Sequence, residues 1–151
     1  EIESGSIDVT ELADEAIEVL TPVASAADVR LELSADQRAV AIGGSEAVSR
    51  VLRNLLDNAI RFAPAGSAVV VEVRADDGVV VRVLDDGPGF DPAFVDEAFE
   101  RFTRGDPSRE RSTGGSGLGL AIARGFVEAL GGSISAVPGP GGCVVFHLPR
   151  A

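Results

Sequence analysis

The chain has 151 residues, a formal net charge of -11 and 45% hydrophobic residues, a size that suits one domain with a single hydrophobic core. Apart from His147, every basic residue is an arginine, and so acidic a chain argues against a nucleic-acid partner, which would require dense positive charge. No run reaches the ~20 apolar residues needed to cross a bilayer, so we expect no membrane-spanning segment in the chain. The single cysteine, Cys143, excludes an intramolecular disulfide, fits a reducing cytoplasmic setting and is expected to be a small buried hydrophobe.

In the first half of the chain, the hydrophobic patterns predict short strands alternating with amphipathic helices. Thr10 is a candidate N-cap for the first helix, and Pro64 marks the end of the second. In chain order, we expect a strand at 6–9, a helix at about 11–24, two strands joined by a turn at 29–33 and 39–42, and a helix that opens at Ser45 and Glu46.

The second half predicts two hairpins and a third helix. Asp77-Gly78 between two β-branched runs is a strong hairpin signal, and the run from Pro138 to Gly142 indicates a second hairpin with a longer loop. About three helices and seven strands, arriving largely as hairpins, predict an α/β two-layer sandwich in which helices cover one face of a mixed, mainly antiparallel sheet. The expected elements are strands at 69–73 and 79–83, a helix from about Leu118 to Leu130, and strands at 133–137 and 143–148.

Three polar residues share one face of the second predicted helix. Asn54, Asn58 and Arg61 are spaced i, i+4 and i+7, which places them within an arc of about 60°. Amide oxygens suit Mg²⁺, and a guanidinium suits phosphate, so this stripe could face a ligand. An ordinary solvated helix face explains the same pattern.

Two glycine-rich segments follow. In the first, Asp85 ends a predicted strand before the turn residues Gly87 and Gly89, so its carboxylate could accept a hydrogen bond from an exocyclic amine. The second, 114–120, enters a helix, where exposed N–H groups and the helix dipole can hold phosphates. Four arginines between residues 101 and 111 could also hold an anion. Taken singly, these segments could be ordinary turns and solvated loops.

The order of these motifs resembles the catalytic ATP-binding domain of histidine kinases. An Asn-bearing helix, an Asp-x-Gly-x-Gly turn, a Phe-Glu-Arg-Phe segment at 99–102 and a Gly-x-Gly-Leu-Gly-Leu loop follow one another along the chain. The resemblance extends from Ile7 to Pro149 and implies the Bergerat fold, shared with gyrase, Hsp90 and MutL ATPases. It also implies that residues 1–151 form a single ATP-binding catalytic domain, without the sensor and dimerisation domains of such kinases.

The resemblance further implies ATP and Mg²⁺ as cofactors and assigns a role to each motif residue. Asn58 would bind Mg²⁺, Asn54 would assist at the phosphates, Asp85 would read the adenine amine, and the segment from Phe99 to about Gly114 would form the lid over ATP. The implied catalytic residues are Asn54, Asn58 and Arg104. The implied nucleotide-binding residues are Asn54, Asn58, Arg61, Phe62, Asp85, Gly87, Gly89, Phe99, Arg104, Gly115, Ser116, Gly117, Leu118, Gly119 and Leu120.

The expected reaction follows from the residue at position 54. ATP-hydrolysing members of the superfamily carry a glutamate four residues before the metal-binding asparagine, whereas here Asn54 has an amide, which cannot act as a general base. The resemblance therefore implies transfer of the γ-phosphoryl group to a histidine. We interpret His147 as a strand residue, so the acceptor would come from a dimeric helical domain that precedes Glu1.

The resemblance also implies a response regulator downstream and a longer, membrane-anchored parent protein with this domain in the cytoplasm. Three alternatives stay open: an ATP-hydrolysing clamp of the gyrase or MutL kind, an anti-sigma-type kinase that phosphorylates serine, and a degenerate regulator that binds no nucleotide.

Overall fold

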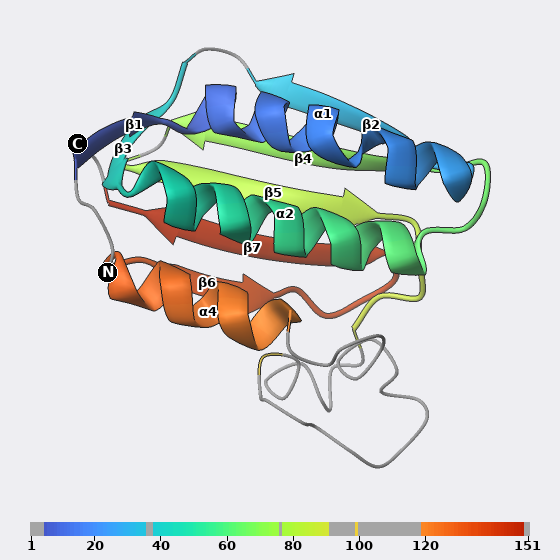
Figure 1. Cartoon of the computed structure of the whole chain (residues 1–151). Coiled ribbons are helices and arrows are strands. Elements are labelled where there is room, and N and C mark those ends of the chain that lie inside the picture. The colour runs from blue at the N-terminus through green and yellow to red at the C-terminus, as the bar shows by residue number, and fades with distance from the viewer. Residues whose placement is uncertain (1–4, 36–37, 76, 91–98, 100–118, 150–151) are drawn as a thin grey trace.

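The computed structural model describes residues 5–35, 38–75, 77–90, 99 and 119–149. Within these residues, three helices lie side by side on one face of a five-stranded sheet, and two short strands form a second, smaller sheet (Figure 1). The two-layer α/β fold expected from the sequence is confirmed. In chain order the elements are β1 (Gly5–Asp8), α1 (Val9–Ala26), β2 (Arg30–Ala35), β3 (Val40–Gly43), α2 (Ser45–Phe62), β4 (Ala68–Ala75), β5 (Val79–Asp85), α4 (Gly119–Ala129), β6 (Ser133–Ala136) and β7 (Gly142–Leu148).

The larger sheet is mixed and mainly antiparallel, as predicted. Its strand order is β2-β4-β5-β7-β6, and every neighbouring pair is antiparallel except β2 and β4. Both predicted hairpins, β4 with β5 and β6 with β7, are confirmed. The strand β5 therefore lies in the middle of the sheet, where its end at Asp85 has neighbours on both sides.

The two strands expected at 29–33 and 39–42, β2 and β3, are present but lie in different sheets. The strand β2 pairs with β4, and β3 pairs with β1 in the smaller sheet. The start of β3 lies beside the start of α1. There Val9 N–H donates to the carbonyl oxygen of Ala39 at 2.8 Å, and Ala39 N–H donates to Thr10 Oγ1 at 3.1 Å.

The helix α1 begins earlier than expected, and Asp8, not Thr10, is its N-cap. The Asp8 carboxylate accepts a hydrogen bond from Glu11 N–H at 3.0 Å, which satisfies one of the free donors of the first turn. Thr10 lies inside the first turn, and its hydroxyl accepts the hydrogen bond from Ala39. Thr10 therefore ties α1 to the start of β3.

The core lies between the helices and the inner face of the sheet. On α2, the side chains of Leu52, Leu55 and Leu56 are at most 1% exposed, and buried valines alternate along β4 and β5. Full burial of each such side chain contributes about 1.5–3 kcal/mol. The helix α2 packs against α1 on one side, against α4 on the other and against the sheet beneath it, so neighbours hold it from three directions.

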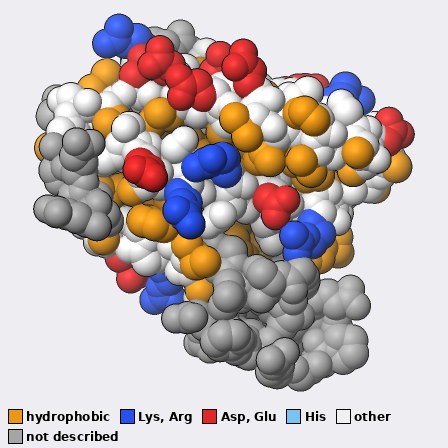
Figure 2. All heavy atoms as spheres, viewed as in Figure 1, with side chains coloured by type: hydrophobic (Ala, Val, Ile, Leu, Met, Phe, Trp, Pro, Cys, Tyr) orange, Lys and Arg blue, Asp and Glu red, His pale blue; other side chains and the backbone are white. Residues whose placement is uncertain are grey.

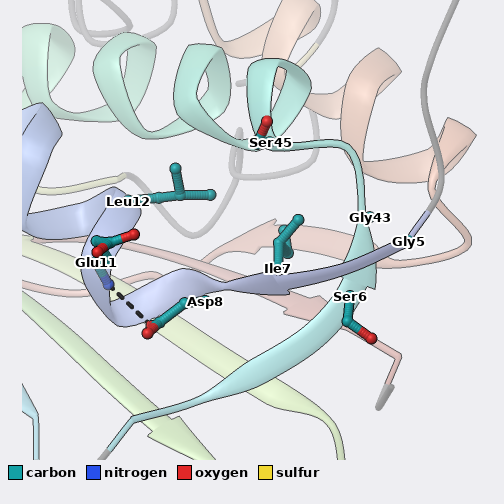
Figure 3. Close-up of a pocket in the computed structure, with 8 residues that line it drawn as sticks. All are labelled: Gly5, Ser6, Ile7, Asp8, Glu11, Leu12, Gly43 and Ser45. Atoms are coloured by element: carbon teal, nitrogen blue, oxygen red, sulfur yellow. Dashed lines mark hydrogen bonds between the residues drawn. The ribbon is translucent and has the colours of Figure 1, made fainter.

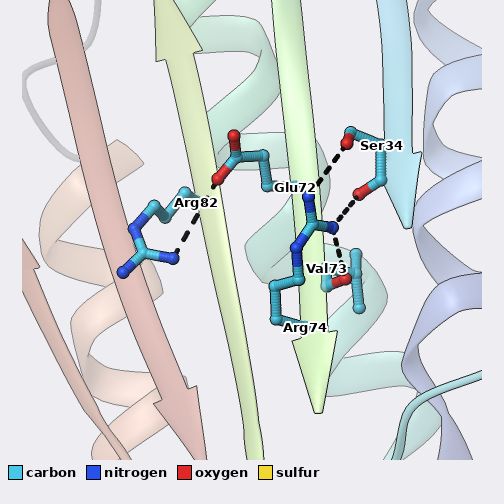
Figure 4. Close-up of polar contacts among 5 residues, drawn as sticks. All are labelled: Ser34, Glu72, Val73, Arg74 and Arg82. Atoms are coloured by element: carbon cyan, nitrogen blue, oxygen red, sulfur yellow. Dashed lines mark hydrogen bonds and ion pairs between the residues drawn. The ribbon is translucent and has the colours of Figure 1, made fainter. Parts of the chain in front are cut away.

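The other face of the sheet carries polar side chains (Figure 4). Arg74 donates to the carbonyl oxygens of Ser34 at 2.9 Å and Val73 at 3.0 Å, and to Ser34 Oγ at 3.1 Å. Arg82 lies 4.0 Å from Glu72 on the next strand. This polar face explains why the helices cover one side of the sheet.

Cys143 departs from its expected burial. Alternation along β7 turns Val144 and Phe146 toward the core and leaves Cys143 half-buried on the polar face. This partial burial raises the pKa of the thiol above its ordinary value, because the thiolate would lose solvation.

The outer surface of α1 is acidic over its N-terminal half and apolar toward its C-terminal end (Figure 2). The exposed acids are Glu11, Asp14, Glu15 and Glu18, and the exposed valines are Val19 and Val23. None of the helices in the described part of the chain has the length and hydropathy of a membrane span.

Candidate functional site

The most distinctive polar group of the fold is the carboxylate of Asp85, the last residue of β5. It is buried, with 5% of its surface exposed. Its Oδ1 accepts a hydrogen bond from Gly87 N–H at 2.7 Å and a second from Gly142 N–H, across the sheet, at 3.2 Å. A buried carboxylate needs such donors to be stable, and here they also fix its direction.

The turn after Asp85 requires glycine at two positions. A Cβ on Gly87 would overlap the carbonyl oxygen of Phe62, the last residue of α2. Gly89 has a φ of +81°, in the left-handed region, and a Cβ there would overlap the carbonyl oxygen of Gly139. The turn is therefore pressed between the end of α2 and the loop that joins β6 to β7.

The polar stripe predicted on α2 lies on the C-terminal half of that helix, whose last residue contacts this turn. Asn54 and Asn58 are half-buried, whereas Arg61 is exposed and pairs with Asp57 one turn earlier at 3.1 Å. An exposed pair of this kind contributes about 0.3–0.5 kcal/mol, so it does not prevent Arg61 from turning to another anion. Phe62 ends the helix and is half-buried.

The helix α4 brings a helix N-terminus to the same end of the domain. The helices α2 and α4 run antiparallel (Figure 1), and the Arg50 guanidinium lies 5.9 Å from the Phe126 ring. Because α4 runs antiparallel to α2, its first residue, Gly119, lies toward the C-terminal half of α2 (Figure 1). The N-terminal N–H groups of α4 are therefore on the side of the domain where α2 carries Asn58.

The structure places the predicted site residues unevenly. It brings Asp85, Gly87 and the backbone of Phe62 together. It places the Phe99 and Leu120 side chains in the core, at 6% and 5% exposure. Gly119 is the first residue of α4. Arg104, Gly115, Ser116, Gly117 and Leu118 lie outside the described residues.

A pocket of about 350 Å³ lies elsewhere, at the opposite end of α2 (Figure 3). The Asp8 carboxylate at its edge accepts from Glu11 N–H and pairs with Arg38 at 3.1 Å. The pocket and the predicted chemistry thus do not coincide. We place the candidate site at Asp85, because its buried carboxylate with two backbone N–H donors, and not the pocket, carries the predicted chemistry. The pocket is lined by Gly5, Ser6, Ile7, Asp8, Glu11, Leu12, Gly43 and Ser45.

His147 lies on β7, as the sequence predicted. Its Nε2 is 3.3 Å from the carbonyl oxygen of Asp77 in the β4–β5 turn, and the ring is half-buried. Among the described residues, no group of three His, Cys, Asp or Glu side chains could hold a metal ion.

The sequence interpretation missed Gly142. The run from Pro138 to Gly142 was assigned to a hairpin loop, but Gly142 also donates to Asp85 and Gly139 N–H donates to the carbonyl oxygen of Phe90 at 3.1 Å. The density of glycines in that run was the available signal. Such glycines allow close backbone approach as well as tight turns.

Comparison with known proteins identifies the family of the chain. A family described as histidine kinase-, DNA gyrase B- and HSP90-like ATPase matches residues 43–151. Sensor-like histidine kinase SenX3 of Mycobacterium tuberculosis is 36% identical over 146 residues, which cover 95% of this chain and 36% of that protein. Sensor protein KdpD of the same species is 44% identical over 104 residues, covering 69% of this chain and 12% of that protein. The chain thus spans well under two thirds of these curated relatives.

Solved structures give the same result at the level of the fold. The mycobacterial sensor histidine kinase MprB superposes with a TM-score of 0.82 and 32% identity, covering 98% of this chain and 99% of that one. Full-length ShkA in complex with AMPPNP superposes with a TM-score of 0.84 and 28% identity, covering 100% of this chain and 32% of that one. The family match and the end-to-end similarity to MprB show that the chain belongs to the histidine kinase-, gyrase B- and HSP90-like ATPase family, as the catalytic domain of a sensor histidine kinase.

Proposed function

We propose that the chain binds Mg-ATP and donates the γ-phosphoryl group to a histidine on a separate dimerisation domain of the same protein. The observation that carries this proposal is the buried Asp85 carboxylate, fixed at a strand end by two backbone N–H groups. Such a group is a preformed acceptor for the exocyclic amine of adenine. The flat base would lie over the glycine turn, with Phe62 at the end of α2 beside it.

The triphosphate and Mg²⁺ fit the neighbouring helices. Mg²⁺ prefers oxygen ligands and completes its shell with substrate phosphates, so Asn58 would supply an amide oxygen and Asn54 would assist at the phosphates. When bound, the ion would neutralise charge on the phosphate oxygens. The N-terminus of α4 provides N–H groups and the positive end of a helix dipole. Arg61, Arg104 and the glycines between 115 and 119 are the further phosphate contacts that we propose.

In the proposed reaction, a histidine nitrogen attacks the γ-phosphorus in line. A P–N bond forms, the bond from the γ-phosphorus to the bridging oxygen breaks, and ADP leaves. The domain contributes positioning and electrostatic stabilisation. Asn54 has no basic group that could activate a water molecule, so transfer is favoured over hydrolysis. His147, held on β7 against the β4–β5 turn, is not the proposed acceptor.

The proposal implies two partners. The first is the histidine-bearing dimerisation domain, and the second is a response regulator that receives the phosphoryl group. We place the reaction in the cytoplasm, where ATP is available, within a membrane-anchored parent protein.

A titration of the chain with Mg-ATP, followed by recovery of the bound nucleotide, tests the proposal. We expect saturable binding of one ATP that is recovered intact, and much weaker binding when EDTA removes Mg²⁺. Addition of the dimerisation domain should then yield acid-labile, base-stable phosphohistidine. Rapid conversion to ADP by the chain alone would indicate an ATPase, phosphoserine on a partner would indicate the anti-sigma-type kinase, and the absence of binding would indicate a degenerate regulator.

A further inference from the structure

The loop between β6 and β7 (residues 137–141, the β6–β7 loop) lies against both ends of the turn that follows β5 (residues 85–90, the base-reading turn). At one end, Gly142, the first residue after the loop, donates its N–H to Asp85 Oδ1 at 3.2 Å. At the other, Gly139 N–H donates to the carbonyl oxygen of Phe90 at 3.1 Å. The middle of the turn is packed as tightly, because Gly89 leaves no room for a Cβ against Gly139. The base-reading turn and the β6–β7 loop with Gly142, more than fifty residues apart in sequence, are thus held together by hydrogen bonds and close backbone contacts.

The two hydrogen bonds to Asp85 differ in origin. Gly87 belongs to the same turn as Asp85, so its N–H moves with the carboxylate, whereas Gly142 reaches it from the neighbouring strand β7. A carboxylate is planar. Two donors that approach Oδ1 from separate segments therefore fix the plane of the group and the direction of its second oxygen. With Gly87 as the only one of these two donors, the carboxylate could rotate with the turn.

We propose that Gly142 and the β6–β7 loop are positioning elements for base recognition: they aim the Asp85 carboxylate and so set the selectivity for the exocyclic amine of adenine. This inference rests on the proposed role of Asp85 as the base-reading group. Gly142 acts through Asp85 by its backbone N–H, which explains why a side chain is not needed there. Preorganisation of this kind raises affinity, since the acceptor is already ordered before the nucleotide arrives.

The test uses a pair of nucleotides that differ in one group. ATP carries the exocyclic amine and purine riboside triphosphate lacks it, so the ratio of their dissociation constants with Mg²⁺, the amine ratio, reports the hydrogen bond to Asp85. A hydrogen bond to a charged group corresponds to an amine ratio of roughly 10 to 100. Gly142→Pro removes the N–H donor. We expect it to lower this ratio by about fivefold or more, because the Asp85 carboxylate is then no longer preorganised for the amine. The dissociation constant of purine riboside triphosphate itself should change by less than about threefold. General damage to the site would instead weaken the binding of both nucleotides.

Matched variants separate positioning from distortion. Val19→Ala trims an exposed side chain of α1, outside the loop and the turn, and should leave the amine ratio within about twofold, as expected for a surface change. Asp85→Ala should bring the ratio near one. In the double variant, Gly142→Pro should then have no further effect, because two residues that act through one contact are not additive.

Each outcome decides the inference. If folded Gly142→Pro keeps the wild-type amine ratio while Asp85→Ala loses it, Asp85 still reads the base and the positioning role is wrong. If Asp85→Ala keeps the ratio, the proposed role of Asp85 is wrong, and the inference falls with it. If Gly142→Pro lowers the ratio equally in the Asp85→Ala background, the loop acts by distortion. Should circular dichroism show that Gly142→Pro does not fold, Gly141→Ala replaces it: this variant keeps every N–H but strains a φ of +77° and places a Cβ 3.2 Å from the Asp85 carbonyl oxygen. A drop in its ratio supports the inference, and an unchanged ratio overturns it.

Discussion

Replacement of Asp85 by asparagine should change which purine the domain binds without unfolding it. Asparagine keeps a carbonyl oxygen that can accept from Gly87 and Gly142, but it replaces the other carboxylate oxygen with an NH₂ donor. Against the adenine amine this group offers a donor to a donor, whereas against the O6 carbonyl of guanine it offers a donor to an acceptor. We therefore expect preference to move from ATP toward GTP.

The magnitude follows from the kind of hydrogen bond exchanged. A bond to a charged acceptor contributes about 1.5–3 kcal/mol, and a neutral bond about 0.5–1.5 kcal/mol. Loss of the first for ATP and gain of the second for GTP shift the relative affinity by about 2–4.5 kcal/mol, roughly 30- to 2,000-fold.

The effect on stability should separate asparagine from alanine at the same position. Asp85→Ala leaves the buried Gly142 N–H without its acceptor, which costs about 1–3 kcal/mol, while Asp85→Asn keeps that acceptor and should cost less. Urea unfolding followed by circular dichroism measures both variants.

Calorimetric titrations with Mg-ATP and Mg-GTP measure the change in preference. Asp86→Asn, an exposed neighbour with the same change of charge, is the matched control and should leave the preference unchanged. If folded Asp85→Asn retains wild-type affinity for ATP and gains none for GTP, Asp85 does not read the base and the reasoning fails.

Three further changes test other parts of the structure. Asn58→Ala should abolish Mg²⁺-dependent ATP binding in a calorimetric titration, whereas Arg53→Ala, exposed on the same helix, should not; equal loss in both would remove the special role of Asn58. Phe146→Ala, at a core residue 1% exposed, should lower the free energy of unfolding by about 3–5 kcal/mol in urea, and a loss below about 1 kcal/mol would contradict the packing described for β7. Because burial raises the pKa of Cys143, less of its thiol is ionised at pH 8 than in glutathione. Iodoacetamide should therefore alkylate Cys143 more slowly than glutathione, and the rate should increase as the pH rises further. Mass spectrometry follows the alkylation, and a rate equal to that of glutathione would refute this.

Local sequence signals predicted most elements of the fold. The β4–β5 hairpin is an example, because Asp77 and Gly78 adopt positive φ values of 47° and 118°, as an Asp-Gly turn signal requires. The partner strands of β2 and β3, which are β4 and β1, could not be predicted in the same way. Their partners are chosen by contacts far along the chain, such as the one between Thr10 and Ala39, and strand patterns carry no information about such contacts.

In the candidate site, too, the features with a local sequence signal were predictable and the contacts between distant segments were not. Spacing along one helix placed Asn54 and Asn58 on one face, and the strand before a glycine turn pointed to Asp85. The donation from Gly142 to Asp85 was not predictable, since it joins a backbone N–H to a side chain across the sheet. A glycine has no side chain whose chemistry could reveal such a role.

The acidity of the chain also constrains how it could hold a nucleotide. A net charge of -11 opposes the approach of a triphosphate, yet at physiological salt charges are screened beyond about 8 Å, so local groups decide the affinity. At the end of the domain that carries the candidate site, α2 ends at Phe62 with the negative end of its dipole, and the antiparallel α4 begins at Gly119 with the positive end of its dipole. The positive end suits phosphates, and the negative end, next to Asp85, suits an amine donor. A nucleotide bound with its base at the end of α2 and its phosphates at the start of α4 would therefore match both fields, and the reverse orientation would oppose both.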